Sequence, residues 1–220
     1  MNSVRLWYKK SGLAIYTSHL DMNRCFTRAV RMAGIPLWYT EGFNPHPYLN
    51  FLLPLPLGTG AEKDPIDIRI TEDISFDEIK SRLNAVLPGG IEIVAVTEPA
   101  IKVSEVAKAG YEIILEFLTP EEACAFAAGA IAVIESGELN AEKRSKRGIK
   151  TVNLCNFISS FDASSEGGSV KIKAVISAGP AENLNAALLI DSLLKEFGAS
   201  AEKTEITRTE IFTADGKIFI

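Results

Sequence analysis

The sequence has few cysteines and few histidines, and this limits the sites that it can build. Its 220 residues contain three cysteines and two histidines. Cys25, Cys124 and Cys155 are far apart and form no CxxC pair, so they support neither an iron–sulfur cluster nor a structural zinc site. We expect them to be reduced, buried thiols and expect no cofactor in this chain, although a metal ion remains possible.

The chain also lacks the apolar segments that direct a protein to a membrane. No run approaches the ~20 apolar residues of a membrane span. Near the N-terminus, Arg5, Lys9 and Lys10 interrupt any apolar signal core. We therefore expect a cytoplasmic protein with no membrane partner.

Charge is unevenly distributed along this otherwise ordinary globular sequence. The chain is 47% hydrophobic and 23% charged, with a net charge of −5. Its length suits one large domain or two small ones. Residues 1–60 hold six basic and two acidic residues, a net +4, so the rest carries −9. A basic segment in an acidic protein indicates a local anionic partner.

Residues 17–48 hold both histidines and most of the unusual patterns. Ser18 followed by Asp21 is typical of a helix N-terminus, and Gly34 before Pro36 is typical of a helix end. Between these signals, apolar residues recur at helical spacing and predict one buried face. A different face carries the row Arg24, Arg28 and Arg31.

The same stretch contains residue types that can do chemistry. His19 lies in the first helical turn, where the helix dipole favours the neutral imidazole that binds metals or accepts protons. His46 is held between two prolines, after the turn signal Asn44-Pro45. With Asp21 and Glu41, the two histidines are candidate catalytic residues, and His19, His46 and Glu41 are candidate metal ligands. However, positions 19 and 21 diverge on a helix.

Local patterns predict an α+β fold with two similar halves. In residues 1–98, strand, helix, strand, strand, helix and strand follow one another, with strands at 4–9, 36–40, 65–71 and 91–96 and a helix at 76–86. In residues 108–220 we expect strands at 111–118, 139–145, 169–177 and 205–212, and helices at 119–136 and 180–197. This βαββαβ order predicts two tandem ferredoxin-like halves with antiparallel sheets.

A second basic cluster lies in the weakly patterned region 139–160. It comprises Lys143, Arg144, Lys146, Arg147 and Lys150, with Glu142 as the nearby acid. Such a run is typical of a solvated loop. It is also a candidate RNA- or anion-binding element, together with the Arg24, Arg28 and Arg31 row and Asn44.

The stretch 18–47 resembles the signature of the radical-SAM-linked proteins, a family of uncharacterised bacterial proteins. The resemblance rests on a Ser-His-Leu-Asp helix start, spaced arginines, an Ala-Gly helix end and a Glu-Gly-Phe-Asn-Pro-His-Pro loop. The matching residues are 18–21, Arg24, Arg28, Arg31, Ala33, Gly34 and 41–47. Where the family has a basic or small polar residue after the last proline, this chain has Tyr48.

The resemblance implies a radical-SAM protein as partner and a role near RNA modification or processing. The iron–sulfur cluster and SAM would belong to that partner. Three hypotheses remain open. The chain is an RNA-binding module for tRNA or rRNA, with arginines on phosphates and Phe43 and Tyr48 stacked on bases. Alternatively, it is an enzyme using His19, Asp21, Glu41 and His46, or a non-catalytic scaffold fixed by internal ion pairs.

Overall fold

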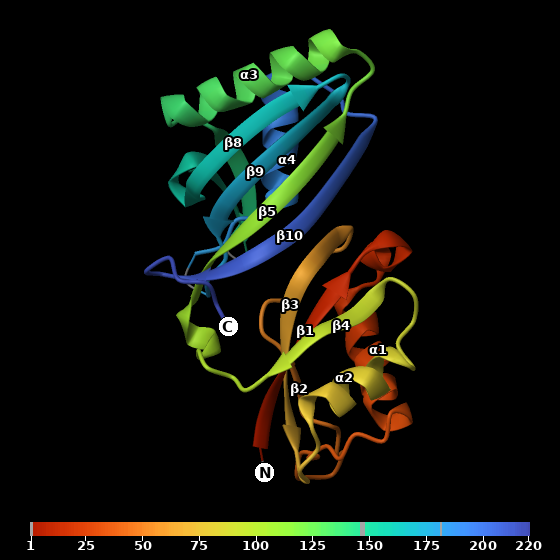
Figure 1. Ribbon diagram of the computed structural model, residues 1–220. Coiled ribbons are helices and arrows are strands. Elements are labelled where there is room, and N and C mark those ends of the chain that lie inside the picture. Colours follow the sequence, from red (N-terminus) through yellow and green to blue (C-terminus); the bar gives the residue numbers. More distant parts are fainter. Residues whose placement is uncertain (1, 146–147, 181) are drawn as a thin grey trace. The chain divides into compact units, whose positions relative to one another are not determined.

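The computed structural model describes residues 2–145, 148–180 and 182–220, and the chain forms two compact units. Unit 1 comprises Met1–Val103 with Ile220, and unit 2 comprises Ser104–Phe219. Each unit contains helices and antiparallel strands (Figure 1). The α+β class expected from the sequence is therefore confirmed. No helix in the described part of the chain is both long and apolar enough to cross a membrane.

Unit 1 builds a small sheet with two α-helices. Its elements are β1 (Asn2–Lys10), the 3-10 helix η1 (Gly12–Tyr16), α1 (His19–Met32), β2 (Leu49–Phe51), β3 (Thr59–Ile70), α2 (Phe76–Asn84) and β4 (Ile91–Thr97). The strands lie in the order β4-β1-β3-β2, and each neighbouring pair is antiparallel. Residues 36–40, expected as a strand, form only isolated bridges such as Leu37 to Ile70.

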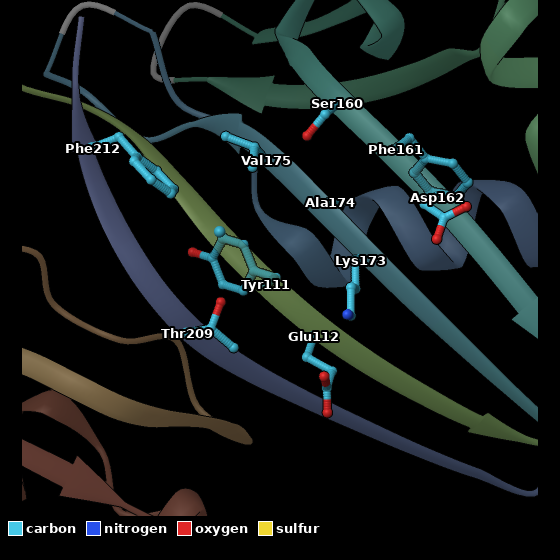
Figure 2. Close-up of a pocket in the computed structure, with 11 residues that line it drawn as sticks. Tyr111, Glu112, Ser160, Phe161, Asp162, Lys173, Ala174, Val175, Thr209 and Phe212 are labelled. Carbon is cyan, nitrogen blue, oxygen red and sulfur yellow. The ribbon is translucent and has the colours of Figure 1, made fainter. Parts of the chain in front are cut away.

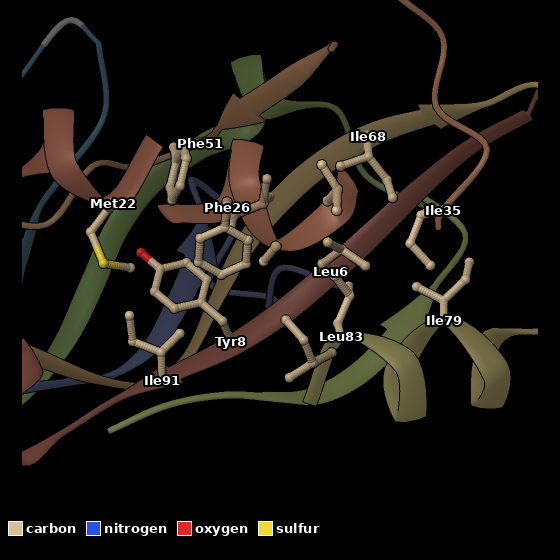
Figure 3. Packing of buried hydrophobic residues seen from close by; sticks show 14 of the residues in the cluster. Leu6, Tyr8, Met22, Phe26, Ile35, Phe51, Ile68, Ile79, Leu83 and Ile91 are labelled. Carbon is tan, nitrogen blue, oxygen red and sulfur yellow. The ribbon is translucent and has the colours of Figure 1, made fainter. Parts of the chain in front are cut away.

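The core of unit 1 follows from strand alternation. Leu6 lies opposite Ile66, and both are fully buried on the same face of the sheet. The apolar stripes of α1 and α2 complete one cluster with this face (Figure 3). Within it, the rings of Tyr8, Phe26 and Phe51 meet edge to face, with centroids 5.5–5.9 Å apart. This aromatic group joins β1, α1 and β2, which supply one ring each.

On the opposite face of the unit 1 sheet, the strand side chains include an ion pair whose arginine is buried. Arg5 is 1% exposed and donates to both carboxylate oxygens of Asp67, at 2.8 and 3.2 Å. It also donates to the carbonyl oxygens of Ile101 and Ile220. A charge withdrawn from water needs such compensation, so Arg5 has a structural role.

Unit 2 contains antiparallel sheet strands and a separate hairpin. Its elements are η2 (Val103–Glu105, at the boundary), β5 (Val106–Glu116), α3 (Pro120–Ser136), β6 (Asn140–Ser145), β7 (Gly148–Asn153), η3 (Leu154–Phe157), β8 (Ile158–Glu166), β9 (Ser169–Ser177), α4 (Ala186–Glu196) and β10 (Lys203–Thr213). The sheet has the order β10-β5-β9-β8, whereas β6 pairs with β7 in a two-stranded sheet.

Several expectations for unit 2 were wrong. The segment 139–145 was expected in the main sheet, but its strand pairs only with β7. The strand beside β9 is β8, a serine-rich segment that its local pattern does not reveal. Helix α4 begins at Ala186 rather than near residue 180, because Asn185 caps it and accepts from the Ala187 N–H. Cys124 is exposed rather than buried.

Candidate functional site

The approach to α1 is fixed by a buried lysine. Lys10 is 2% exposed, and its Nζ donates to the carbonyl oxygens of Ile15 and Thr17, at 3.2 and 3.0 Å. Burial lowers the pKa of Lys10, while the Asp64 carboxylate opposes the shift. These bonds hold the chain in place immediately before the α1 N-cap.

The start of α1 uses Asp21 for capping. The Ser18 hydroxyl oxygen accepts from the Asp21 N–H at 3.2 Å and donates to the Asp21 carboxylate at 2.7 Å. Arg24 also donates to this carboxylate, at 3.2 Å. The Ser18 hydroxyl, followed by Arg24, holds the pKa of the Asp21 carboxyl below its usual range. Asp21, a candidate catalytic residue, thus has a structural explanation.

The arginine row lies on the exposed surface of α1, as its spacing predicted. The Arg24 side chain is 69% exposed, and Arg28 and Arg31 are also exposed. Arg24 has Asp21 as its counter-charge. Among the residues that the structure describes, neither Arg28 nor Arg31 has an acidic group within 4.0 Å. Two of the three guanidinium groups are therefore open to an external anion.

Arg31 connects the row to a hairpin formed by residues 38–48. Its guanidinium carbon lies 5.9 Å from the centre of the Tyr39 ring. The hairpin is closed by bonds from the Tyr48 N–H to the Trp38 oxygen and from the Thr40 N–H to the His46 oxygen, at 3.0 and 2.9 Å. The two halves of the sequence signature thus meet where α1 ends.

His46 is held in the hairpin by its own loop. Its Nδ1 lies 3.1 Å from the Thr40 hydroxyl and 3.2 Å from the Asn44 carbonyl oxygen. Because a carbonyl oxygen only accepts, the contact with Asn44 is a hydrogen bond in the tautomer that carries the hydrogen on Nδ1 and the lone pair on Nε2. His46 is exposed. In that tautomer its exposed ring can accept a hydrogen bond from a ligand at Nε2.

His19 has a different environment. It is exposed, and its ring meets Phe51 edge to face with centroids 5.2 Å apart. Within the described residues, no group of three or more His, Cys, Asp and Glu side chains is placed to hold a metal ion. Glu41 is exposed and makes no ion pair within that part of the chain. The structure thus does not gather the four candidate catalytic residues into one metal centre.

One cluster at the hairpin was missed by sequence reasoning. The guanidinium carbon of Arg69 on β3 lies 4.4 Å from the Tyr48 ring centre and 5.4 Å from that of Trp38. Arg69 alternates with the buried Ile68 and Ile70 and so faces away from the core, and its position in the predicted strand 65–71 indicated no partner for it. Since Arg69 covers Tyr48, that ring is less available for stacking than the sequence suggested.

The second basic cluster lies on the β6–β7 hairpin. In its ladder, Lys143 lies opposite Lys150 and Arg144 opposite Ile149. Lys146 and Arg147 fall outside the described residues. The candidate role of this cluster in RNA binding stays a prediction.

Unit 2 has an open groove of about 450 Å³ on its sheet (Figure 2). A Cβ added to Gly110 would lie 3.3 Å from both the Phe212 ring and the Thr209 hydroxyl, so these side chains would have to shift by a few tenths of an ångström to admit it. Glu112 at its edge pairs with Lys171 at 2.7 Å. None of the candidate site residues lines this groove, whose lining combines charged side chains such as Glu112 and Lys173 with apolar ones such as Phe212.

A comparison with models of protein families identifies the family of this chain. A family model described as "Uncharacterized protein conserved in bacteria (DUF2344)" matches residues 3–186. The chain belongs to this family. A comparison with curated proteins gives no match. Among solved structures, the chain is similar to an unknown protein from Galdieria sulphuraria, with 9% identity over 94% of this chain and 96% of that chain. The TM-score is 0.27, too low to support a conclusion about fold or function.

Proposed function

We propose that the chain is an RNA-binding module that grips the phosphate backbone through the arginine row of α1. The observation that carries this proposal is the exposure of Arg28 and Arg31 without an acidic partner in the described residues. The planar guanidinium group of arginine can donate two hydrogen bonds to one phosphate, so it suits phosphate better than the ammonium group of lysine does. In a protein with a net charge of −5, such a row is a local anion site rather than a general property of the surface.

We further propose that each unit is a ferredoxin-like domain. In support, unit 1 has the order strand, helix, strand, strand, helix, strand, and its strand pairs are antiparallel. Unit 2 has the same order when the β6–β7 hairpin is treated as an insertion after α3. The arginine row then lies on the first helix of the first domain.

In this proposal the RNA-bound chain works beside a radical-SAM enzyme, in tRNA or rRNA modification or processing. The resemblance of residues 18–47 to radical-SAM-linked proteins supports the pairing. The partner would supply the iron–sulfur cluster and SAM, since the three cysteines of this chain are widely separated. This chain would bind the RNA and orient it for the partner.

The test is a salt titration of binding to purified tRNA and rRNA fragments. The variant Arg24→Ala/Arg28→Ala/Arg31→Ala is compared with a control of equal charge change, Lys171→Ala/Lys173→Ala/Lys195→Ala, whose three lysines are exposed on unit 2. Each lost phosphate contact lowers the slope of log affinity against log salt by about 0.7–0.9.

We therefore expect the arginine variant to bind more weakly, with a slope shallower by about 2, and the lysine variant to match the wild type. Circular dichroism checks that both variants are folded. Absence of wild-type binding at low salt, or equal losses in the two variants, would refute the proposal.

A further inference from the structure

The tip of the 38–48 hairpin exposes one aromatic ring completely. The relative exposure of Phe43 is 112%, the highest among the large hydrophobic residues of the described chain. The other aromatic rings of the hairpin have arginine partners: Tyr39 lies against Arg31, and Trp38 and Tyr48 lie against Arg69. No ring or cation contact of Phe43 occurs among the described residues. Phe43 therefore has no packing role within the part of the chain that the structure describes.

The backbone holds Phe43 in this position. Gly42, immediately before it, has φ +127°, which L side chains rarely adopt, and an added Cβ would meet nothing within 4 Å. Glycine is thus required here for backbone conformation and not for space. On either side of the tip, the His46 N–H donates to the Thr40 hydroxyl at 3.2 Å and the Thr40 N–H to the His46 oxygen at 2.9 Å. The ring is presented by a closed turn, which limits the entropy lost on binding.

The surroundings of Phe43 favour a nucleic acid over an apolar protein pocket. Glu41, Asn44, Pro45 and His46 beside it are all exposed, so the ring is not part of an apolar patch. At the foot of the hairpin, Arg31 lies against Tyr39. Phe43 lies four positions after Tyr39, which is at most about 14 Å of extended chain. A short stretch of nucleic acid carries a negatively charged phosphate close to a flat base, and so matches this arrangement.

We propose that the protein selects single-stranded or looped RNA, with an unpaired base stacked on Phe43 while neighbouring phosphates contact Arg28 and Arg31. This inference rests on the proposed RNA-binding function and adds the class of RNA and the residue that recognises it. Bases in a duplex already stack on each other and are hidden, so they offer no face to this ring. Stacking is tolerant of sequence, because every base has a π-face.

The experiment measures binding of a 12-nucleotide unstructured RNA and of the blunt duplex formed with its complement, by fluorescence anisotropy at low salt. Four variants are compared with the wild type: Phe43→Ala, Phe43→Leu, Phe43→Trp and the matched control Phe76→Ala, which removes a phenylalanine that is 37% exposed at the start of α2. Leucine keeps an apolar side chain but has no ring face, so it separates stacking from simple hydrophobic contact.

The wild type should bind the single strand more tightly than the duplex. Phe43→Ala and Phe43→Leu should weaken single-strand binding by about 5- to 150-fold and leave duplex binding unchanged. Phe43→Trp and Phe76→Ala should bind like the wild type.

The outcomes separate this inference from the function beneath it. If the wild type binds neither RNA, the proposed function fails and this inference fails with it. If the wild type binds RNA with the expected salt dependence but Phe43→Ala is unaffected, only the stacking inference is overturned. A result in which Phe43→Ala keeps its RNA binding but loses binding to a protein also overturns the stacking inference.

Discussion

Replacing Phe51 with alanine should destabilise unit 1 strongly, whereas the same replacement at Phe43 should not. Phe51 is 9% exposed, and its ring meets those of Tyr8 and Phe26 edge to face at 5.9 and 5.6 Å. Removing a buried phenylalanine from such a site costs about 3–5 kcal/mol, including the cavity that it leaves. This is a large share of the about 5–15 kcal/mol that stabilises a typical domain.

Urea unfolding followed by tryptophan fluorescence can measure this difference. Trp7 and Trp38 are the two tryptophans of the chain, and both lie in unit 1, so the signal reports on that unit. Phe43→Ala should change the free energy of unfolding by less than about 0.5 kcal/mol, since its ring is fully exposed and packs against none of the described residues. A loss below about 1 kcal/mol for Phe51→Ala, or similar losses for both variants, would refute the packing of Phe51 against Tyr8 and Phe26 as a major source of stability.

Two further predictions concern the residues that support the site. The depressed pKa of Asp21 means that its contribution to the stability of α1 is present above the unfolded-state pKa of about 3.9 and is lost as pH falls through the lower folded-state value. In carboxyl NMR titrations, Ser18→Ala should raise this pKa more than Arg24→Ala does; an unchanged value in Ser18→Ala would show that the hydroxyl is not its main cause. Gly90→Ala should cost about 2 kcal/mol or more in urea unfolding, because Gly90 has φ +84° and an added Cβ would lie 2.5 Å from the Ser11 oxygen. The neighbouring Gly89→Ala is the control, since its Cβ would meet nothing within 4 Å, and equal losses at both glycines would contradict this explanation.

The sequence predicted elements well where their signals are local. Helix α1 spans His19–Met32 with Ser18 as N-cap, as the capping residues and Gly34 indicated. Strand β8 was missed because its segment, ISSFDASSE, has low β-propensity and only one buried residue, Ala163. Its place in the sheet depends on pairing with β9. Conversely, residues 140–145 do form a strand, but local pattern could not say which strand would pair with it.

The candidate site shows the same division between local and distant information. The capping role of Asp21 was visible in the sequence, because Ser18 and Asp21 are three residues apart. The stacking of Arg69 on Tyr48 was not, since it requires residues 38–48 to lie along β3, where the Trp38 N–H donates to the Arg69 oxygen at 2.9 Å. The two histidines lie in one short stretch of sequence and were therefore grouped as one candidate site. In the structure they have different partners: His19 packs on Phe51, whereas His46 is bonded within its own hairpin.

The anionic partner inferred for α1 depends on compensation of charge, which composition alone does not determine. A net +4 in residues 1–60 includes Arg5 and Lys10, yet both are buried and bonded within unit 1. Arg24 is paired with Asp21. What remains for a ligand is chiefly Arg28 and Arg31, so the effective charge of this surface is smaller and more local than the sequence count suggests. A partner that binds here must bring its negative charge close to those two guanidinium groups, as a phosphate of an RNA strand can.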